Sequence, residues 1–303
     1  MKAVCALFPG LGLGEQHPGM GRCLVESFPA AQDVFDEASA ALGTDMRRLC
    51  WQSTPRTLAQ APHAQPALVT TALAAWRVLE SLGVPVALAA GHGLGTLTAL
   101  VATGAMSLSD AVQLARRHGE ITMAAPGEGR MCTAAASTTL PRHRLTALAR
   151  RLGLHLAADN GSRHLTFAGS RRNVQRYLAA VGPRAYAHSA PHACHSPLMR
   201  SAEPQWRDIV AATDIRRPHA PVALPSRGTF TTDPQALRAD LITTLHSPVP
   251  WRTTMVMAGS RPRVALGPAR QLISHAAGPY QPPIPLVASP VTALTTAHAL
   301  TQH

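Results

Sequence analysis

Apolar runs of strand length alternate with stretches of helical periodicity along most of the chain. Residues 2–8 form a short apolar run that ends at Pro9, as expected for a buried parallel strand. Residues 29–42 carry apolar side chains at helical spacing, and residues 65–82 form a longer apolar helix. This alternation predicts an α/β fold in which helices cover a parallel sheet.

A strand, a sharp turn and a helix follow one another around residue 92. An apolar strand at 84–90 leads into Gly91-His92-Gly93-Leu94-Gly95, and a helix from 94 to about 103 leads out. This is the setting of a nucleophile elbow, in which Gly-x-Ser-x-Gly places a serine hydroxyl at the top of a sheet. The middle residue here is Gly93, so the sequence predicts the elbow without its nucleophile.

The pattern changes at about residue 130, after a helix expected to begin at 109–110 and to end near Gly119. From there the sequence predicts a βαββαβ order, which is the ferredoxin-like split unit. Its expected strands lie at 131–136, 154–158, 164–168 and 184–188, and its expected helices at 142–152 and 171–181.

We therefore predict a small subdomain inserted into a larger α/β domain. The predicted bounds are 1–128 for the first part of the large subdomain, 129–190 for the small subdomain and 191–278 for the return, with core strands at 221–224 and 264–266. The tail at 279–303 is rich in Pro, Ala and Thr and is expected to wrap the surface.

Composition narrows the class of protein. Hydrophobic residues make up 46% of the 303 residues and charged residues 15%, which favours a compact globular chain over a disordered one. No apolar run reaches the length of a membrane span, and no signal peptide is predicted. Five scattered cysteines without a Cys-x-x-Cys pair favour reduced thiols and a cytoplasmic location.

The net charge is +12, and Lys2 is the only lysine, so arginine supplies nearly all of it. The basic residues are spread along the chain and aromatic residues make up only 4%, which argues against nucleic acid as a partner. An acidic protein or a phosphorylated cofactor fits the charge as well.

Seven short motifs add a family resemblance. Taken in order, they resemble the malonyl-CoA:acyl carrier protein transacylase family, including polyketide synthase acyltransferases, over about residues 3–275. The resemblance implies an α/β-hydrolase-like large subdomain with a ferredoxin-like small one. The motifs are Phe8-Pro9-Gly10-x-Gly12, Gly19-Met20-Gly21, Gln65-Pro66-Ala67-Leu68, Gly91-His92-x-Leu94-Gly95, His195-Ser196-Pro197-Leu198-Met199, Ser247-Pro248-Val249-x-Trp251 and Gly267-Pro268.

The resemblance also implies roles for particular residues. In the family a serine takes an acyl group from coenzyme A and passes it to the phosphopantetheine thiol of a carrier protein, and Gly93 matches that serine. The family's general base matches His195, and the backbone carbonyl that orients the base matches Ser247. The two backbone N–H groups of the oxyanion hole match Leu11 and Leu94.

Two further positions differ from the family pattern in a way that bears on the substrate. The arginine that holds the malonyl carboxylate falls at His118, and the glutamine of Phe-Pro-Gly-Gln-Gly falls at Leu11. A neutral imidazole cannot replace the bidentate guanidinium. We therefore expect an uncharged acyl chain rather than malonyl.

The remaining expected site residues are His92 as a second proton carrier, and Gly12, Thr96 and Cys194 near the substrate. Cys194 and Ser196 flank the general base and are the alternative nucleophiles, although neither lies on the elbow.

A metal site is not expected. His188, His192 and His195 with Cys194 do not have the spacing of a zinc finger, and the resemblance accounts for His195 without a metal.

Three functions remain open, of which ordinary transacylation through an unidentified nucleophile comes last on mechanism, although the family resemblance points to it. The first is an enzyme in which His195 activates water or an acceptor directly against a thioester carbonyl. The second is a non-catalytic binding protein that docks a carrier protein or a synthase. In both, no cofactor is tightly bound, and acyl carrier protein or coenzyme A carries the acyl group. The expected partners are acyl carrier protein and acyl-CoA, with a ketosynthase as a further candidate; neither nucleic acid nor a membrane is expected.

Overall fold

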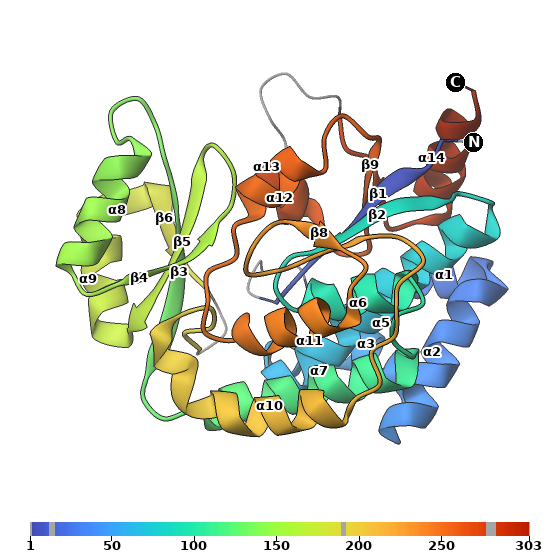
Figure 1. Cartoon of the computed structure of the whole chain (residues 1–303), viewed down its shortest axis with the longest axis horizontal. Coiled ribbons are helices and arrows are strands. Elements are labelled where there is room, and N and C mark those ends of the chain that lie inside the picture. The colour runs from blue at the N-terminus through green and yellow to red at the C-terminus, as the bar shows by residue number, and fades with distance from the viewer. Residues whose placement is uncertain (1, 12–15, 189–191, 277–282, 303) are drawn as a thin grey trace.

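The computed structural model describes residues 2–11, 16–188, 192–276 and 283–302, and it contains two separate sheets (Figure 1). The larger sheet has the strand order β10-β9-β1-β2-β7-β8, in which every neighbouring pair is parallel except the antiparallel edge pair β7/β8. Its strands are β1 (Val4–Phe8), β2 (Val86–Gly91), β7 (Val222–Ala223), β8 (Phe230–Thr231), β9 (Arg263–Leu266) and β10 (Leu286–Val287).

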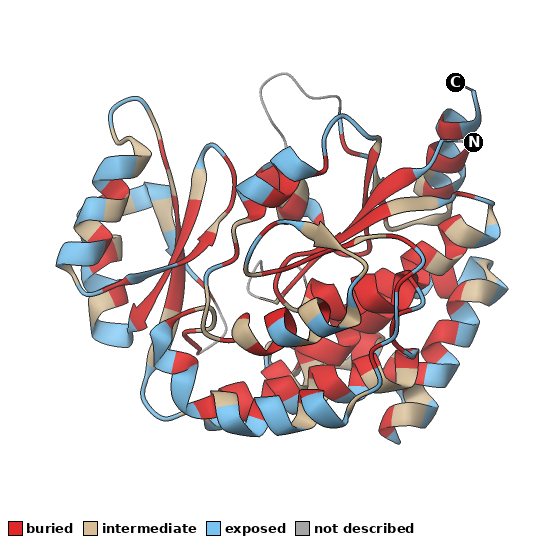
Figure 2. Ribbon diagram, viewed as in Figure 1, coloured by how far each residue is buried: buried red, intermediate tan, exposed pale blue. Residues whose placement is uncertain are grey.

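Helices cover this sheet on both faces, and the ribbon of the central strands and of the helix sides next to them is largely coloured as buried (Figure 2). All five residues of β1 are buried, as expected for a central parallel strand with helices on both sides. The helices of this part are α1 (Arg22–Ser27), α2 (Pro29–Leu42), α3 (Met46–Gln52), α4 (Pro55–Leu58), α5 (Ala61–Ser81), α6 (Gly95–Ala102), α7 (Leu108–Ala124), the 3₁₀ helix η2 (Pro197–Ala202), α10 (Glu203–Ala212), α11 (Pro234–Thr243), α12 (Trp251–Met257), α13 (Arg270–Ala276) and α14 (Pro290–Thr301).

The smaller sheet is antiparallel, with strand order β4-β5-β3-β6, and it forms the left-hand part of the molecule in Figure 1. Helices α8 and α9 pack together on it around a core that includes Leu145, Phe167 and Tyr177. The predicted ferredoxin-like order is therefore confirmed. The elements are β3 (Gly129–Ala135), α8 (Arg142–Arg151), β4 (His155–Asp159), β5 (His164–Ser170), α9 (Arg171–Val181), the 3₁₀ helix η1 (Gly182–Arg184) and β6 (Ala185–Ala187).

Two helices extend beyond the bounds that the sequence predicts. α5 begins at Ala61, four residues earlier than expected, and carries Pro66 within it. α7 continues past Gly119 to Ala124. A side chain at Gly119 would lie 2.6 Å from the backbone of Ala61, so this glycine permits close packing of α5 and α7 instead of ending a helix.

The prediction that the tail only wraps the surface is wrong. β10 extends the large sheet by pairing with β9, and α14 buries Ala293, Ala297 and Leu300 against the large core. The prediction failed because a two-residue strand has no periodicity of its own and forms through pairing with its neighbour.

The fold places the elbow at the carboxyl ends of β1 and β2, beside the small sheet. Phe8 pairs with Gly91, and the His92 N–H donates to the Phe8 carbonyl at 3.0 Å. Backbone bonds from Asp159 and Val249 join β4 to the chain that leads into α12, so the small sheet is anchored near this edge. Within the described ranges, no helix is long and apolar enough to span a bilayer.

Candidate active site

The turn between β2 and α6 is too tight for side chains at its glycines. A β-carbon at Gly91 would lie 2.0 Å from the backbone of Gly95, and one at Gly95 would lie 2.4 Å from the Phe8 carbonyl oxygen. Gly93 has φ +52°, and the Gly95 and Thr96 N–H groups close the turn onto the carbonyls of His92 and Gly93 at 3.0 and 3.1 Å. The glycines therefore make the elbow geometry possible.

His195 lies directly over this turn. Its Nδ1–H donates to the Thr244 carbonyl at 2.6 Å, because a carbonyl can only accept, and its Nε2 therefore carries a lone pair. That Nε2 lies 2.8 Å from the point where a β-carbon of Gly93 would stand. The ring thus occupies space next to the elbow that a larger residue 93 would need, and its basic nitrogen faces the turn.

The environment keeps this imidazole neutral. Burial lowers the pKa of His195, and backbone hydrogen bonds at Thr244 and Ser247 oppose that shift. Ser247 was the orienting residue expected from the sequence. The structure places the Thr244 carbonyl at 2.6 Å as the direct partner and gives Ser247 a further backbone contribution. A neutral, oriented imidazole is suited to general-base chemistry.

His118 lies on α7 on the other side of the site. Its Nδ1–H donates to Gln65 Oε1 at 2.9 Å, and its ring meets the Trp206 ring edge-on at 5.0 Å. Burial lowers the pKa of His118 to about 3, with smaller contributions from His195 and His192. His118 therefore contributes no positive charge at neutral pH.

His92 begins a buried chain of hydrogen bonds that leads into the small subdomain. Its Nε2–H donates to Asn160 Oδ1 at 2.7 Å, and Asn160 Nδ2 donates to Thr166 Oγ1 at 2.9 Å. The hydroxyl of Thr133 then bridges Thr166 and His188, at 2.8 Å to each. Burial lowers the pKa of His92 to about 4, so the elbow is attached to the small sheet through neutral groups.

A cavity of about 30 Å³ lies between these groups, which is room for about one water molecule. None of the described residues that line it is Arg, Lys, Asp or Glu. The lining residues are Leu11, Gln65, Leu94, His118, Met131, His192, Cys194 and His195.

The structure thus brings together five of the residues expected from the sequence: Leu11, Leu94, His118, Cys194 and His195. His92 lies beside the elbow, and Thr96 is buried with its hydroxyl near the Gly91 carbonyl at 3.4 Å, outside the lining of the cavity. Gly12 lies outside the described residues.

The two alternative nucleophiles are poorly suited to attack. Burial raises the pKa of the Cys194 thiol to about 12, which leaves little thiolate at neutral pH. The Ser196 hydroxyl is buried and donates to the Ala193 carbonyl at 2.6 Å. Within the parts of the chain that the structure describes, no three His, Cys, Asp or Glu side chains are grouped to hold a metal.

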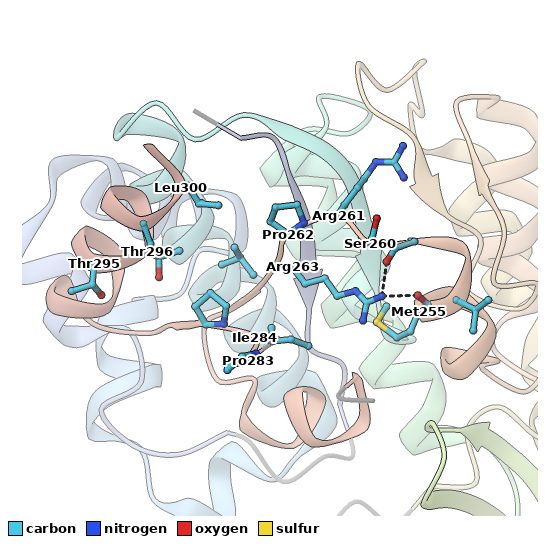
Figure 3. A pocket seen from close by; sticks show the side chains of 15 residues that line it. Met255, Ser260, Arg261, Pro262, Arg263, Pro283, Ile284, Thr295, Thr296 and Leu300 are labelled. Atoms are coloured by element: carbon cyan, nitrogen blue, oxygen red, sulfur yellow. Dashed lines mark hydrogen bonds between the residues drawn. The ribbon is translucent and has the colours of Figure 1, made fainter. Parts of the chain in front are cut away.

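A much larger cavity of about 750 Å³ lies elsewhere, between α12, α14 and the start of β9 (Figure 3). Arg263 at its wall donates to the carbonyls of Met255 and Gly259, both at 2.8 Å. The described residues that line this cavity include no His, Cys, Asp or Glu. Volume therefore favours the large cavity, whereas the lining residues favour the small one. We assign the candidate site to the small cavity because it contains the oriented bases.

A family model described as an acyl transferase domain matches residues 7–258. The chain therefore belongs to the acyl transferase family. The malonyl CoA-acyl carrier protein transacylase of Bacillus subtilis (strain 168) is 30% identical over 283 residues, which cover 90% of this chain and 89% of that protein. The spectinabilin polyketide synthase system protein NorB of Streptomyces orinoci is 31% identical over 281 residues, and the match covers 88% of this chain and 13% of NorB.

Solved structures agree with this family and with the predicted fold class. FabD from Acinetobacter baumannii superimposes with a TM-score of 0.91 at 29% identity, over 99% of both chains. The malonyl CoA-acyl carrier protein transacylase (fabD) of Coxiella burnetii superimposes with a TM-score of 0.92 at 27% identity, over 99% of both chains.

Proposed function

We propose that this protein acts on acyl thioesters of acyl carrier protein or coenzyme A in fatty-acid or polyketide-type biosynthesis, without an acyl-serine intermediate. One observation carries the proposal: His195 holds its Nδ1–H on the Thr244 carbonyl and directs a basic Nε2 at the elbow turn. This geometry supports a general-base role for His195, whereas Gly93 offers no side-chain nucleophile.

The proposed reaction uses His195 as the base for an external acceptor. Nε2 takes a proton from water, or from an acceptor hydroxyl, amine or thiol. The oxygen, nitrogen or sulfur atom that loses this proton attacks the thioester carbonyl carbon. The carbon–sulfur bond then breaks, and the sulfur leaves with the electron pair and receives the proton from the imidazolium. The N–H of Leu94, at the start of α6, and the N–H of Leu11 would stabilise the oxyanion.

The proposed substrate carries an uncharged acyl group. His118 is neutral, and the described lining of the cavity includes no arginine or lysine. Burial lowers the pKa of His192, and Arg130 adds to that shift without lining the cavity. Burying a malonyl carboxylate there without a charge partner would cost roughly 3–5 kcal/mol.

A second candidate function is carrier-protein binding without catalysis. The observation that favours it is the volume of about 30 Å³, which is too small for an acyl chain unless the subdomains separate. In this case the protein would bind acyl carrier protein, or a synthase component such as a ketosynthase, and hydrolyse nothing. The cytoplasmic location and the subdomain bounds 129–190 remain predictions under either function.

Intact-mass spectrometry of the carrier protein separates the two functions. Acyl carrier protein loaded with acetyl, butyryl or malonyl groups is incubated with the protein, with His195→Gln, and with the surface control His298→Gln. We expect loss of acetyl and butyryl groups, at least about a hundredfold slower with His195→Gln and unchanged with the control. Malonyl should be the poorest substrate.

Two outcomes would contradict the proposed reaction. A stable adduct of one acyl group on Cys194 or Ser196 would show that the protein has its own nucleophile. Carrier binding with no turnover of any thioester would favour the second candidate.

A further inference from the structure

The positive charge of this protein is concentrated in the small subdomain. Residues 129–190 contain ten arginines and one acidic residue, Asp159, and so carry +9 of the chain's total of +12. The remainder of the chain, although far longer, is therefore close to neutral at +3. A charge distribution this asymmetric needs an explanation beyond the average arginine content of the sequence.

Six of these arginines lie on the outward sides of α8 and α9, and we refer to them as the arginine face. All six are exposed, whereas the inward positions of the two helices, such as Leu145 and Val174, are buried in the small core. Both helices lie at the far left of Figure 1, with exposed outer sides in Figure 2. The arginine face comprises Arg144, Arg150 and Arg151 of α8 and Arg171, Arg172 and Arg176 of α9.

Four of these side chains come from helix ends that lie next to each other. A β-carbon at Gly153, just after α8, would lie 3.1 Å from Asn173 Nδ2, in the first turn of α9. The end of α8, with Arg150 and Arg151, is therefore beside the start of α9, with Arg171 and Arg172. Cations at a helix N-terminus oppose the helix dipole, so the arginines of α9 are placed against local stability.

The described carboxylates do not pair with this face. Arg142, outside the arginine face, pairs with Asp159 at 2.7 Å, whereas among the described residues no arginine of the arginine face has an acidic partner within 4.0 Å. In the large subdomain, by contrast, arginines such as Arg22, Arg77 and Arg117 pair with glutamates on their own helices.

We propose that the arginine face is a docking surface for the acidic face of another protein. Stacking of nucleic-acid bases is disfavoured because the exposed positions of α8 and α9 carry no Phe, Tyr or Trp side chain, and Tyr177 is buried. Insertion into a membrane is disfavoured because the exposed positions between the arginines are small or polar, such as Ala147, Gln175 and Ala179.

This surface is separate from the candidate active site. The small sheet lies between them: α8 and α9 pack on one face, and Met131, Ala157 and Ala168 on the other face contact Ala193, close to His195. A partner on the arginine face would therefore leave access to the elbow unchanged. The inference does not depend on the proposed function.

The test measures binding of a fluorescent polyglutamate peptide and of a polyuridine RNA of equal formal charge, by anisotropy at low and high salt. The test variant combines Arg150→Gln, Arg151→Gln, Arg171→Gln and Arg172→Gln. The control combines Arg48→Gln, Arg56→Gln, Arg217→Gln and Arg252→Gln, which removes the same charge from exposed positions of the large subdomain. Hydrogen exchange of the unmodified protein with the peptide bound locates the contact without any substitution.

We expect the peptide to bind at low salt and to be released at high salt. Affinity should fall at least about tenfold in the test variant and less than about threefold in the control. Exchange should slow in α8 and α9. Equal losses in both variants, protection elsewhere, or no binding of the peptide would overturn the proposal, and tighter binding of the RNA at the same arginines would reassign the face to nucleic acid.

Discussion

The two ends of the large sheet differ in both space and chemistry. At the carboxyl ends of β1 and β2, a cavity of about 30 Å³ is lined by His118 and His195. At the start of β9, a cavity of about 750 Å³ is lined mainly by apolar residues together with Arg261 and Arg263, and Arg263 donates to the carbonyls of Met255 and Gly259. The larger cavity would be the default binding site on volume. We choose the candidate site by its oriented neutral bases and not by its volume, because the larger cavity offers no such base among its described lining residues.

Two glycines, one at each end of the sheet, differ in how closely their surroundings are packed. Gly93 and Gly259 both have positive φ, of +52° and +68°. A β-carbon at Gly93 would meet His195 Nε2 at 2.8 Å, whereas one at Gly259, in the wall of the large cavity, would meet nothing closer than Arg261 Nη1 at 3.7 Å. Substitutions at these positions share the backbone strain and differ in what the side chain displaces, so Gly259 is a matched control for Gly93.

The largest expected effect concerns acyl preference after Gly93→Ser. The new hydroxyl would face His195, but the carboxylate of malonyl would still lack a cation beside His118. A deficit of roughly 3 kcal/mol is more than a hundredfold in rate, so Gly93→Ser should acylate itself faster with acetyl- or butyryl-CoA than with malonyl-CoA. Adding His118→Arg should shift the preference toward malonyl.

Mass spectrometry of acyl-enzyme formation by both variants tests this, with Gly259→Ser as the control that should remain unmodified. A preference of the single variant for malonyl-CoA would show that His118 does not set the charge selectivity of the site.

Next in size is the hydrogen-bond chain that leads from the elbow into the small sheet. Thr166→Val keeps the shape of the side chain but leaves the buried Nδ2 of Asn160 without its acceptor. This should lower the free energy of unfolding by about 2 kcal/mol. Thr295→Val, on the exposed side of α14 at the large cavity, should cost less than about 0.5 kcal/mol. Urea denaturation measures both changes in the free energy of unfolding. Equal changes would mean that this chain of hydrogen bonds does not stabilise the elbow end of the sheet.

Acid should affect the elbow end selectively. Burial lowers the pKa of His118 to about 3, so the unfolded chain binds a proton below about pH 6.5 that the folded protein does not. Stability should therefore be lost as the pH falls from about 6.5 toward 3. His118→Gln should reduce that loss by about 1.4 kcal/mol per pH unit. The measurement is the free energy of unfolding in urea at several pH values.

The control for the acid effect is Ile121→Val, a buried substitution in the same helix that should lower the stability curve equally at every pH. If His118→Gln followed the slope of the unmodified protein, the ring would not be held neutral in the native state.

The smallest expected effect compares the two glycines directly. Gly93→Ala and Gly259→Ala both place an alanine at positive φ, which costs roughly 1–2 kcal/mol. Gly93→Ala must also displace the ring of His195 and weaken its bond to the Thr244 carbonyl, which should add about 1 kcal/mol. Thermal or urea unfolding of the pair checks the difference. If Gly259→Ala lowered the free energy of unfolding more than Gly93→Ala, the elbow would not be the more tightly packed of the two positions.

Much of the fold could be predicted because the hydrophobic pattern is local. The helix expected at 171–181 is observed at those bounds, and the order of strands and helices in the small subdomain was clear from periodicity. The remainder depended on contacts between distant segments. α7 continues through Gly119 because α5 packs against it, and β10 is a strand because β9 lies beside it.

The candidate site, too, was predicted in part from local sequence and in part depends on contacts between distant segments. Motif order pointed to residues that line the small cavity, including Leu11, Leu94 and His195. It missed Thr244, because a backbone carbonyl leaves no trace in residue type. It also missed the partners of His92, because Asn160 and Thr166 reach it only through the pairing of β4 and β5.

The position of β1 in the large sheet has a consequence for how the chain is made. β1 pairs with β2 on one side, but its other edge is covered only by β9, about 260 residues later in the sequence. During synthesis, this five-residue strand of apolar side chains therefore has an edge of unpaired backbone N–H and C=O groups until residues 263–266 have left the ribosome. An unpaired edge of this kind is where growing chains associate with one another, so we expect this protein to depend most on chaperones in the interval before β9 emerges.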